Sequence, residues 1–157
     1  MLVKNIMEHI GHNWLQPELT LYQAVCTMRN TRLGGEKTVN GMVVLEHGLK
    51  LVGVLSIKNI IRAAIPLYLE SNLRGFAWDG MLEEHVKKAR DILVGDVMSK
   101  KIITIGPDDS LMRCADLMID NYLQRLPVID ESGRVLGIVH IQDLYSCIAD
   151  LMCSVEK

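Results

Sequence analysis

The chain has 157 residues and a net charge of -2, with 17 Lys and Arg against 19 Asp and Glu. This length suits one ordinary domain or two small, closely packed subdomains. The balanced charges form no basic stripe, so no nucleic-acid partner is expected. No apolar run approaches the roughly 20 residues that cross a bilayer, so we expect no membrane partner and a cytoplasmic location.

The chain contains an internal repeat, which bears on architecture before any single residue is interpreted. One helical apolar pattern occurs twice, at an offset of 90 positions: Leu21, Ala24, Val25 and Met28, then Leu111, Cys114, Ala115 and Met118. A second helical pattern occurs at an offset of 84: Ile57, Ile60, Ile61 and Ala64, then Ile141, Leu144, Tyr145 and Ile148.

The first repeat opens with an apolar segment, Leu2 to Met7. Its first helix should begin after Thr20, because Thr20 and Gln23 have the spacing of a capping box. A hairpin should follow, from two β-rich runs and the turn between them: Met42 to Glu46, His47-Gly48, and Leu51 to Ser56. The hairpin runs directly into a second helix.

Two segments interrupt the symmetry of the repeats. Six extra residues fall between Arg32 and Val39, where Gly34-Gly35 predicts an exposed, flexible loop. The connector from Pro66 to Asp91 contains aromatic residues and a helical, charged stretch from Met81 to Arg90, so we expect it to dock.

The second repeat follows the same order of elements. Its segments are an apolar entry, a second apolar run, a capping serine and a hairpin: Val94 to Met98, Ile102 to Ile105, Ser110, Leu126 to Asp130, and Arg134 to His140. The turn of this hairpin is Glu131-Ser132-Gly133. We predict an α/β (α+β) fold with repeats at 1–65 and 93–157 and a helical connector at 66–92.

The four cysteines lie at helical apolar positions without CxxC spacing: Cys26, Cys114, Cys147 and Cys153. We expect buried thiols in a reducing compartment, with no disulfide and no metal site. The chain has no GxSxG, HExxH or Walker glycine loop, so no enzyme activity is predicted.

A polar pair marks the end of each hairpin: Ser56 with Asn59, and His140 with Asp143. The first residue of each pair ends a strand and the second lies in the first helical turn, so both should face one opening beside free backbone N–H groups. A carboxylate such as Asp143 can accept hydrogen bonds from ribose hydroxyls. Alternatively, these residues only cap their helices.

The paired segments "LVGVLSIKNII" and "VLGIVHIQDLY", preceded by "NIMEH", "DVMSKKIITIGPDDSL" and "QRLPVIDESG", resemble tandem cystathionine-beta-synthase (CBS) domains, a Bateman module. The resemblance implies two βαββα repeats packed sheet to sheet with pseudo-two-fold symmetry. It also implies an adenosine ligand in the cleft between the repeats, with an Asp on the ribose.

The family pattern places Ser or Thr three residues before that Asp. Asp143 keeps the Asp while His140 replaces Ser/Thr, and Ser56 keeps the Ser while Asn59 replaces the Asp. The resemblance further implies that the cleft is lined by Met98, Lys100 and Lys101, together with the strand start near Arg125 and Leu126. Lys100 and Lys101 either neutralise phosphate or are only solvated turn residues.

Two functions are therefore open. The first is a non-catalytic sensor that binds AMP, ADP, ATP or S-adenosylmethionine, needs no other cofactor, and transmits occupancy to an effector protein. The second is a dimerisation or scaffold module with vestigial clefts. In either case we expect a homodimer, formed through the apolar faces of the second helices: Ile61 and Ala64, with Tyr145 and Ile148.

Overall fold

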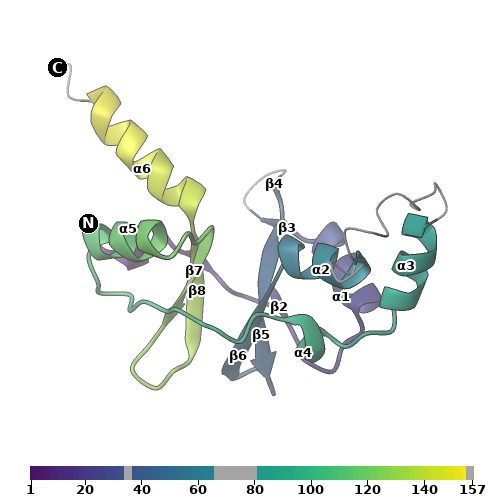
Figure 1. The fold of residues 1–157 in the computed structure, drawn as a ribbon. Helices are drawn as coiled ribbons and strands as arrows, with labels where there is room; N and C mark the ends of the chain where they lie inside the picture. Colours follow the sequence, from purple (N-terminus) through teal and green to yellow (C-terminus); the bar gives the residue numbers. More distant parts are fainter. Residues whose placement is uncertain (34–36, 66–80, 155–157) are drawn as a thin grey trace. The chain divides into compact units, whose positions relative to one another are not determined.

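A computed structural model of the chain describes residues 1–33, 37–65 and 81–154. These residues form a mixed α+β structure with two three-stranded sheets (Figure 1). The chain divides into two compact units: unit 1 is Met1–His12, Leu49–Leu51 and Ile103–Lys157, and unit 2 is Asn13–Gly48 and Val52–Ile102.

Unit 2 is built on a sheet with the strand order β2-β5-β6, in which β2 runs parallel to β5. Its main elements are β2 (Trp14–Leu15), α1 (Leu21–Asn30), β5 (Gly41–Glu46), β6 (Lys50–Ser56), α2 (Ile57–Ala64), α3 (Met81–Ala89) and α4 (Val94–Val97). The first five residues of β5 are buried, as expected for a strand covered on both faces. Helix α2 packs against α3 and α4.

Unit 1 is built on a sheet with the strand order β1-β8-β7, antiparallel throughout. Its elements are the 3-10 helix η1 (Val3–Asn5), β1 (Glu8–His9), α5 (Leu111–Asp120), β7 (Arg125–Ile129), β8 (Val135–His140) and α6 (Ile141–Ser154). Helix α6 packs against β8 and α5.

The segment that opens each repeat packs into the core formed by the other repeat. Val3 is fully buried in the core of unit 1, and Val94 is fully buried in the core of unit 2. Full burial of a valine side chain contributes about 1.5–3 kcal/mol. The compact units therefore do not follow the order of the repeats along the chain, and the boundaries 1–65, 66–92 and 93–157 stay a prediction about the repeats.

The backbone pairings of the two entry segments match each other. In unit 1, Leu2 pairs with Ser110 and Glu8 pairs with Ile138. The equivalent pairs in unit 2 are Leu93 with Thr20 and Ser99 with Val54. The entry segment of each repeat thus extends the sheet of the other.

A glycine permits each of these close approaches. A Cβ atom on Gly137 would overlap the carbonyl oxygen of Glu8, and a Cβ on Gly53 would overlap Sδ and Cγ of Met98. Gly53 and Gly137 occupy the same position in the two repeats, so the same steric requirement occurs twice.

Most of the predicted elements are confirmed. Gln23 N–H donates to Thr20 Oγ1 at 3.2 Å and Thr20 N–H donates to Gln23 Oε1 at 3.0 Å, which completes the capping box. Ser110 Oγ accepts from the N–H of Arg113 at 3.1 Å. Both hairpins form, both lead directly into a helix, and the charged stretch of the connector is α3.

The prediction of a loop between Arg32 and Val39 is wrong at both ends of that segment. Strand β3 (Arg32–Leu33) pairs antiparallel with β4 (Lys37–Thr38). The pairing satisfies backbone groups that a loop would leave to water. Gly34-Gly35, and the aromatic residues at 76 and 78 of the connector, lie outside the described residues.

The expectation of buried thiols holds for only one cysteine. Cys114 is buried, and this burial raises the pKa of its thiol. Cys26 and Cys147 are half-buried, and Cys153 is exposed because the last turn of α6 extends beyond the core. All four cysteines are free of disulfides.

The turn between β7 and β8 is organised by one carboxylate. Asp130 Oδ1 accepts hydrogen bonds from the N–H of Ser132 (2.9 Å), the hydroxyl of Ser132 (2.7 Å) and the N–H of Arg134 (2.9 Å). These bonds hold the pKa of Asp130 below its usual range.

We predict that Gly137→Ala lowers the free energy of unfolding by about 1–3 kcal/mol, because the new methyl group displaces β1 from β8. Urea denaturation followed by circular dichroism measures this change. Gly106→Ala is the control, since its Cβ would meet only the carboxylate of Asp109, with Oδ2 at 3.2 Å. Equal stability of the Gly137 variant and the wild type would contradict the prediction.

We also predict that Asp130→Asn destabilises the chain at neutral pH and has a smaller effect in acid. A carboxyl group with a lowered folded-state pKa contributes stability above its unfolded pKa of about 3.9, and this contribution is lost as the pH falls through the folded value. Melting temperatures of the variant and the wild type should therefore converge below about pH 4. Glu131→Gln removes a charge from the same turn and serves as the control; a gap that does not depend on pH would refute the mechanism.

Candidate functional site

The candidate site of unit 1 lies where β8 ends and α6 begins. His140 is the first polar residue after a run of buried apolar residues, and Asp143 follows in the first turn of α6. The N–H of His140 donates to Oδ2 of Asp143 at 3.1 Å. This bond fixes the start of the helix and orients the carboxylate, and both side chains are half-buried.

Arg125 joins this group through the register of the sheet. It pairs directly with His140 across β7 and β8, so the two side chains lie on the same face. The guanidinium is half-buried, and desolvation lowers its pKa. It remains cationic at neutral pH, and it therefore brings a positive charge to the end of the strand.

Glu8 approaches from the other side of β8. It pairs with Ile138, two residues before His140, so its side chain lies on the same face as the imidazole. Glu8 Oε2 lies 3.5 Å from His140 Nε2. Four charged or polar side chains from β1, β7, β8 and α6 thus gather around the end of the central strand β8.

The equivalent junction in unit 2 is a closed capping box. Asn59 Oδ1 accepts from the N–H of Ser56 at 2.8 Å and from its hydroxyl at 2.9 Å, and Ser56 Oγ accepts from the N–H of Asn59 at 3.3 Å. The two side chains satisfy each other and the start of α2. A ligand at this junction would have to compete with these bonds.

The eight predicted site residues fall into two groups. Unit 1 brings together Arg125, His140 and Asp143, and unit 2 holds the other five: Ser56, Asn59, Met98, Lys100 and Lys101. Met98 packs over Gly53 and contributes to the core of unit 2. Lys100 and Lys101 are exposed.

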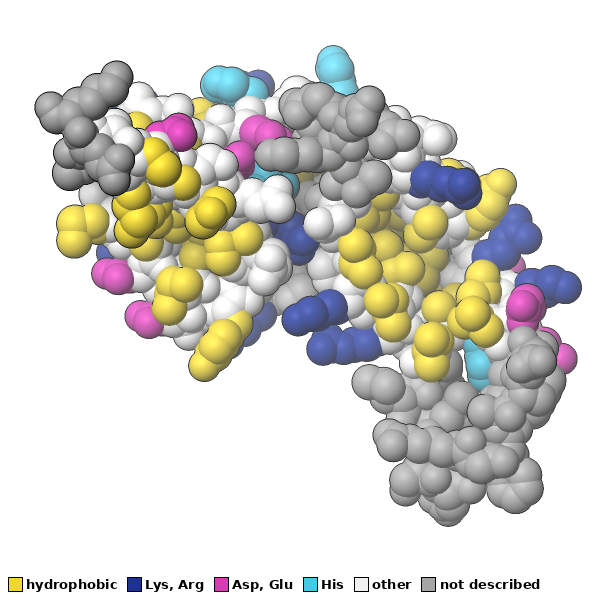
Figure 2. All heavy atoms as spheres, turned by 90° about the horizontal axis from the view of Figure 1, so that it is seen from above, with side chains coloured by type: hydrophobic (Ala, Val, Ile, Leu, Met, Phe, Trp, Pro, Cys, Tyr) yellow, Lys and Arg dark blue, Asp and Glu magenta, His cyan; other side chains and the backbone are white. Residues whose placement is uncertain are grey.

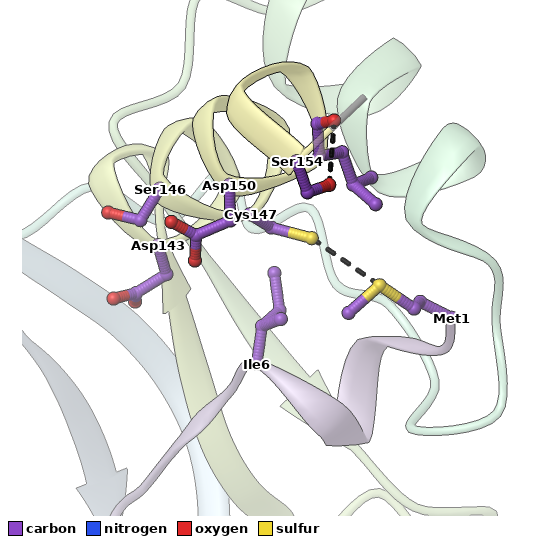
Figure 3. Close-up of a pocket in the computed structure, with 8 residues that line it drawn as sticks. Met1, Ile6, Asp143, Ser146, Cys147, Asp150 and Ser154 are labelled. Carbon is purple, nitrogen blue, oxygen red and sulfur yellow. Dashed lines mark hydrogen bonds between the residues drawn. The ribbon is translucent and has the colours of Figure 1, made fainter. Parts of the chain in front are cut away.

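A cavity of about 480 Å³ lies beside Asp143, between the N-terminal segment and α6 (Figure 3). Its volume is in the range of small-molecule sites. The lining residues are Met1, Ile6, Asp143, Ser146, Cys147, Asp150, Leu151 and Ser154. Figure 3 shows the carboxylates of Asp143 and Asp150 on α6, and the Cys147 thiol directed toward the thioether of Met1, with 3.5 Å between the sulfur atoms.

Sequence reasoning missed Glu8 and most of the cavity. The residues from α6 recur with helical spacing, Asp143, Cys147, Asp150 and Ser154, so they could have been recognised as one polar face. Glu8 carries a weaker signal, because only the pairing of β1 with β8 brings it to His140.

Within the described part of the chain, no helix is long and apolar enough to cross a membrane.

The model of the CBS domain matches this chain twice, at residues 3–66 and 94–150. The chain belongs to the CBS domain family. This CBS-domain protein is 29% identical over 157 residues to an uncharacterized protein of Methanocaldococcus jannaschii, with 92% of this chain and 89% of the relative covered. It is also 29% identical over 114 residues to inosine-5'-monophosphate dehydrogenase of Korarchaeum cryptofilum, but that match covers 73% of this chain and 19% of the enzyme.

The fold of the CBS-domain protein is similar to that of CBSX2 from Arabidopsis thaliana. The TM-score is 0.72 at 21% sequence identity, and 96% of each chain is covered. A crystal structure of CBSX2 in complex with AMP gives a TM-score of 0.69 at 20% identity, with 96% of this chain and 98% of that chain covered. At these identities the likeness establishes the fold.

Proposed function

We propose that this chain is a non-catalytic regulatory module that binds an adenosine nucleotide at the junction of β8 and α6. The grouping of Arg125, His140 and Asp143 around the end of β8 supports the proposal most directly. A carboxylate suits two vicinal ribose hydroxyls, and a half-buried guanidinium suits a phosphate. CBSX2, which shares the fold, has been crystallised with AMP.

The acceptor capacity of the Asp143 carboxylate is central to the proposed contact. Its Oδ2 accepts the backbone N–H of His140, and each carboxylate oxygen can accept more than one hydrogen bond. Asp143 can therefore hold the start of α6 and accept ribose hydroxyls together. Asn59 has one acceptor oxygen, which already accepts two hydrogen bonds from Ser56. We infer that the junction in unit 1 binds adenosine compounds more tightly than the junction in unit 2.

The proposed output lies in a partner protein. The match to inosine-5'-monophosphate dehydrogenase covers a small part of that enzyme, so similar sequences occur attached to a catalytic chain. A ligand regulates such a partner only through a difference in its affinity for two states of the module.

A melting screen tests the proposal against the scaffold alternative. AMP, ADP, ATP and S-adenosylmethionine are added singly at millimolar concentration, and a ligand present at 100 times its Kd should add about 2.7 kcal/mol of stability. We expect at least one compound to raise the melting temperature. No shift with any of the four would reject nucleotide binding and favour the scaffold.

We predict that Asp143→Ala weakens binding of the best compound by about tenfold or more, because a hydrogen bond to a charged group is lost. Asn59→Ala should have a much smaller effect. Asp143→Asn is the more conservative change, since its amide oxygen can still accept the N–H of His140. Calorimetric titration measures the affinities, and circular dichroism checks the fold.

The 2'-deoxy form of the same compound removes one ribose hydroxyl that Asp143 is proposed to contact. Removal of the hydroxyl should weaken binding to the wild type but have little further effect in Asp143→Ala, because the two changes remove one contact. Additive effects would show that Asp143 does not contact the ribose.

We further propose a homodimer formed through exposed apolar helix faces. Each unit has a helix with such a face: Ile57, Ile61 and Ile65 at α2, and Tyr145, Ile148 and Met152 on α6, with exposed fractions between 42% and 71%. Ala64, which the sequence placed on this face, is instead half-buried against the core of unit 2. Figure 2 shows apolar side chains gathered at the surface. Exposed apolar helix faces of this kind are typical of interaction sites.

Light scattering at micromolar concentration should give twice the 17.6 kDa mass of one chain. The double variant Ile61→Glu with Tyr145→Glu should dissociate the dimer, because it places charges within the contact. Met112→Glu is the control, since Met112 is 80% exposed on α5, outside both faces. A monomeric wild type would contradict the proposal.

A further inference from the structure

Three side chains able to bind a metal ion converge in unit 1. Glu8 from β1, His140 from the end of β8 and Asp143 from α6 place one ligand atom each within 4.8 Å of one another. They come from distant parts of the chain, and the pairing of β1 with β8 brings them together.

Two of these atoms are buried without a hydrogen bond to any described residue. Glu8 Oε2 and His140 Nε2 are shielded from solvent, and neither has a hydrogen-bond partner within residues 1–33, 37–65 and 81–154. Their separation of 3.5 Å exceeds the usual length of a hydrogen bond between nitrogen and oxygen. Buried polar atoms without partners are costly, so this arrangement calls for an explanation.

The separation fits two ligands of one metal ion. Zinc binds histidine nitrogen and carboxylate oxygen at about 2.0–2.2 Å, so two ligands of a tetrahedral ion lie about 3.4 Å apart. Glu8 Oε2 and His140 Nε2 have this spacing. Asp143 Oδ2 accepts a hydrogen bond from the backbone N–H of His140, and the carboxylate can still bind the ion.

We propose that Glu8, His140 and Asp143 bind one divalent transition-metal ion, with Zn²⁺ as the preferred ion. The imidazole favours Zn²⁺ over Mg²⁺ and Ca²⁺, which prefer oxygen ligands alone. Three protein ligands leave a fourth position open for water or an exogenous ligand.

The charges near the site are consistent with one dication. The two carboxylates offset its double positive charge, while Arg125, which pairs with His140 in the sheet, adds a positive charge nearby. An anion therefore suits the open position, and a phosphate oxygen has that chemistry. Metal binding itself does not depend on the proposed nucleotide function.

The test is titration of metal-stripped protein with ZnCl₂, MnCl₂ and MgCl₂ by calorimetry, with melting as a second readout. We expect one Zn²⁺ per chain, a raised melting temperature and no comparable response to Mg²⁺. Glu8→Gln should weaken Zn²⁺ binding by about tenfold or more, because loss of even an outer-shell partner of a metal ligand costs about 10- to 100-fold in affinity. Glu131→Gln removes an exposed carboxylate elsewhere in unit 1 and should leave the affinity unchanged.

The free cysteines require their own control. Cys147 lines the cavity beside Asp143 and Cys153 is exposed, so thiolates could bind zinc independently. The variant Cys147→Ser with Cys153→Ser should retain the site. Co²⁺ bound to the wild type should lack the intense charge-transfer band of a thiolate ligand. Zinc binding that disappears with the cysteines would overturn the proposal.

Separate titrations distinguish this proposal from nucleotide binding. Zinc is titrated without nucleotide, and the adenosine compounds are titrated in the presence of EDTA, so either kind of binding can fail alone. Zinc binding without any adenosine binding would reject only the proposed function. The metal site would be rejected if the wild type bound no zinc. It would also be rejected if the zinc affinity were unchanged in both Glu8→Gln and His140→Gln. If Glu8→Gln fails to fold, the zinc affinity of His140→Gln alone is the test.

Discussion

The structure depends on the exchange of entry segments between the two repeats. Val3 and Val94 have no exposed surface, and each fills a core most of whose buried residues come from the opposite repeat. The exchange needs close backbone contact, which Gly53 and Gly137 permit because neither has a Cβ. Neither hairpin with its two helices forms a complete core alone, so the repeats are expected to fold as one cooperative structure.

The same exchange brings together the charged and polar side chains of unit 1. Strand β1 extends the sheet beside β8, and this places Glu8 next to His140 although the two are far apart in the chain. The direct pairing of Arg125 with His140 adds a cation from β7. Side chains from four elements thus gather around the end of the central strand β8, where they combine carboxylate, imidazole and guanidinium groups.

The two repeats share a fold but differ at their strand–helix junctions. Ser56 and Asn59 form a closed set of hydrogen bonds, so their polar atoms are used to start α2. His140 and Asp143 share only one such bond, between a backbone N–H and a carboxylate oxygen. The difference arises from side-chain chemistry, because an imidazole does not close the capping box as a serine hydroxyl does.

Local chemistry made much of the fold predictable from the sequence. The capping of the first helices by Thr20 and Ser110, the two hairpins and the start of α6 after His140 follow from contacts between residues close in the chain. The pairing of β3 with β4 was missed because strands of two residues carry too little pattern to detect.

The sequence by itself determined the doubled architecture and the family, and it predicted three residues of the proposed unit 1 site, because helical periodicity, capping and motif spacing act over a few positions. Only the tertiary structure decided that Glu8 lies beside His140, that Met98 packs over Gly53, and that α6 and the N-terminal segment line an open pocket. These contacts join residues far apart in the chain. They depend on which strands pair and in which register, and local pattern does not encode that choice.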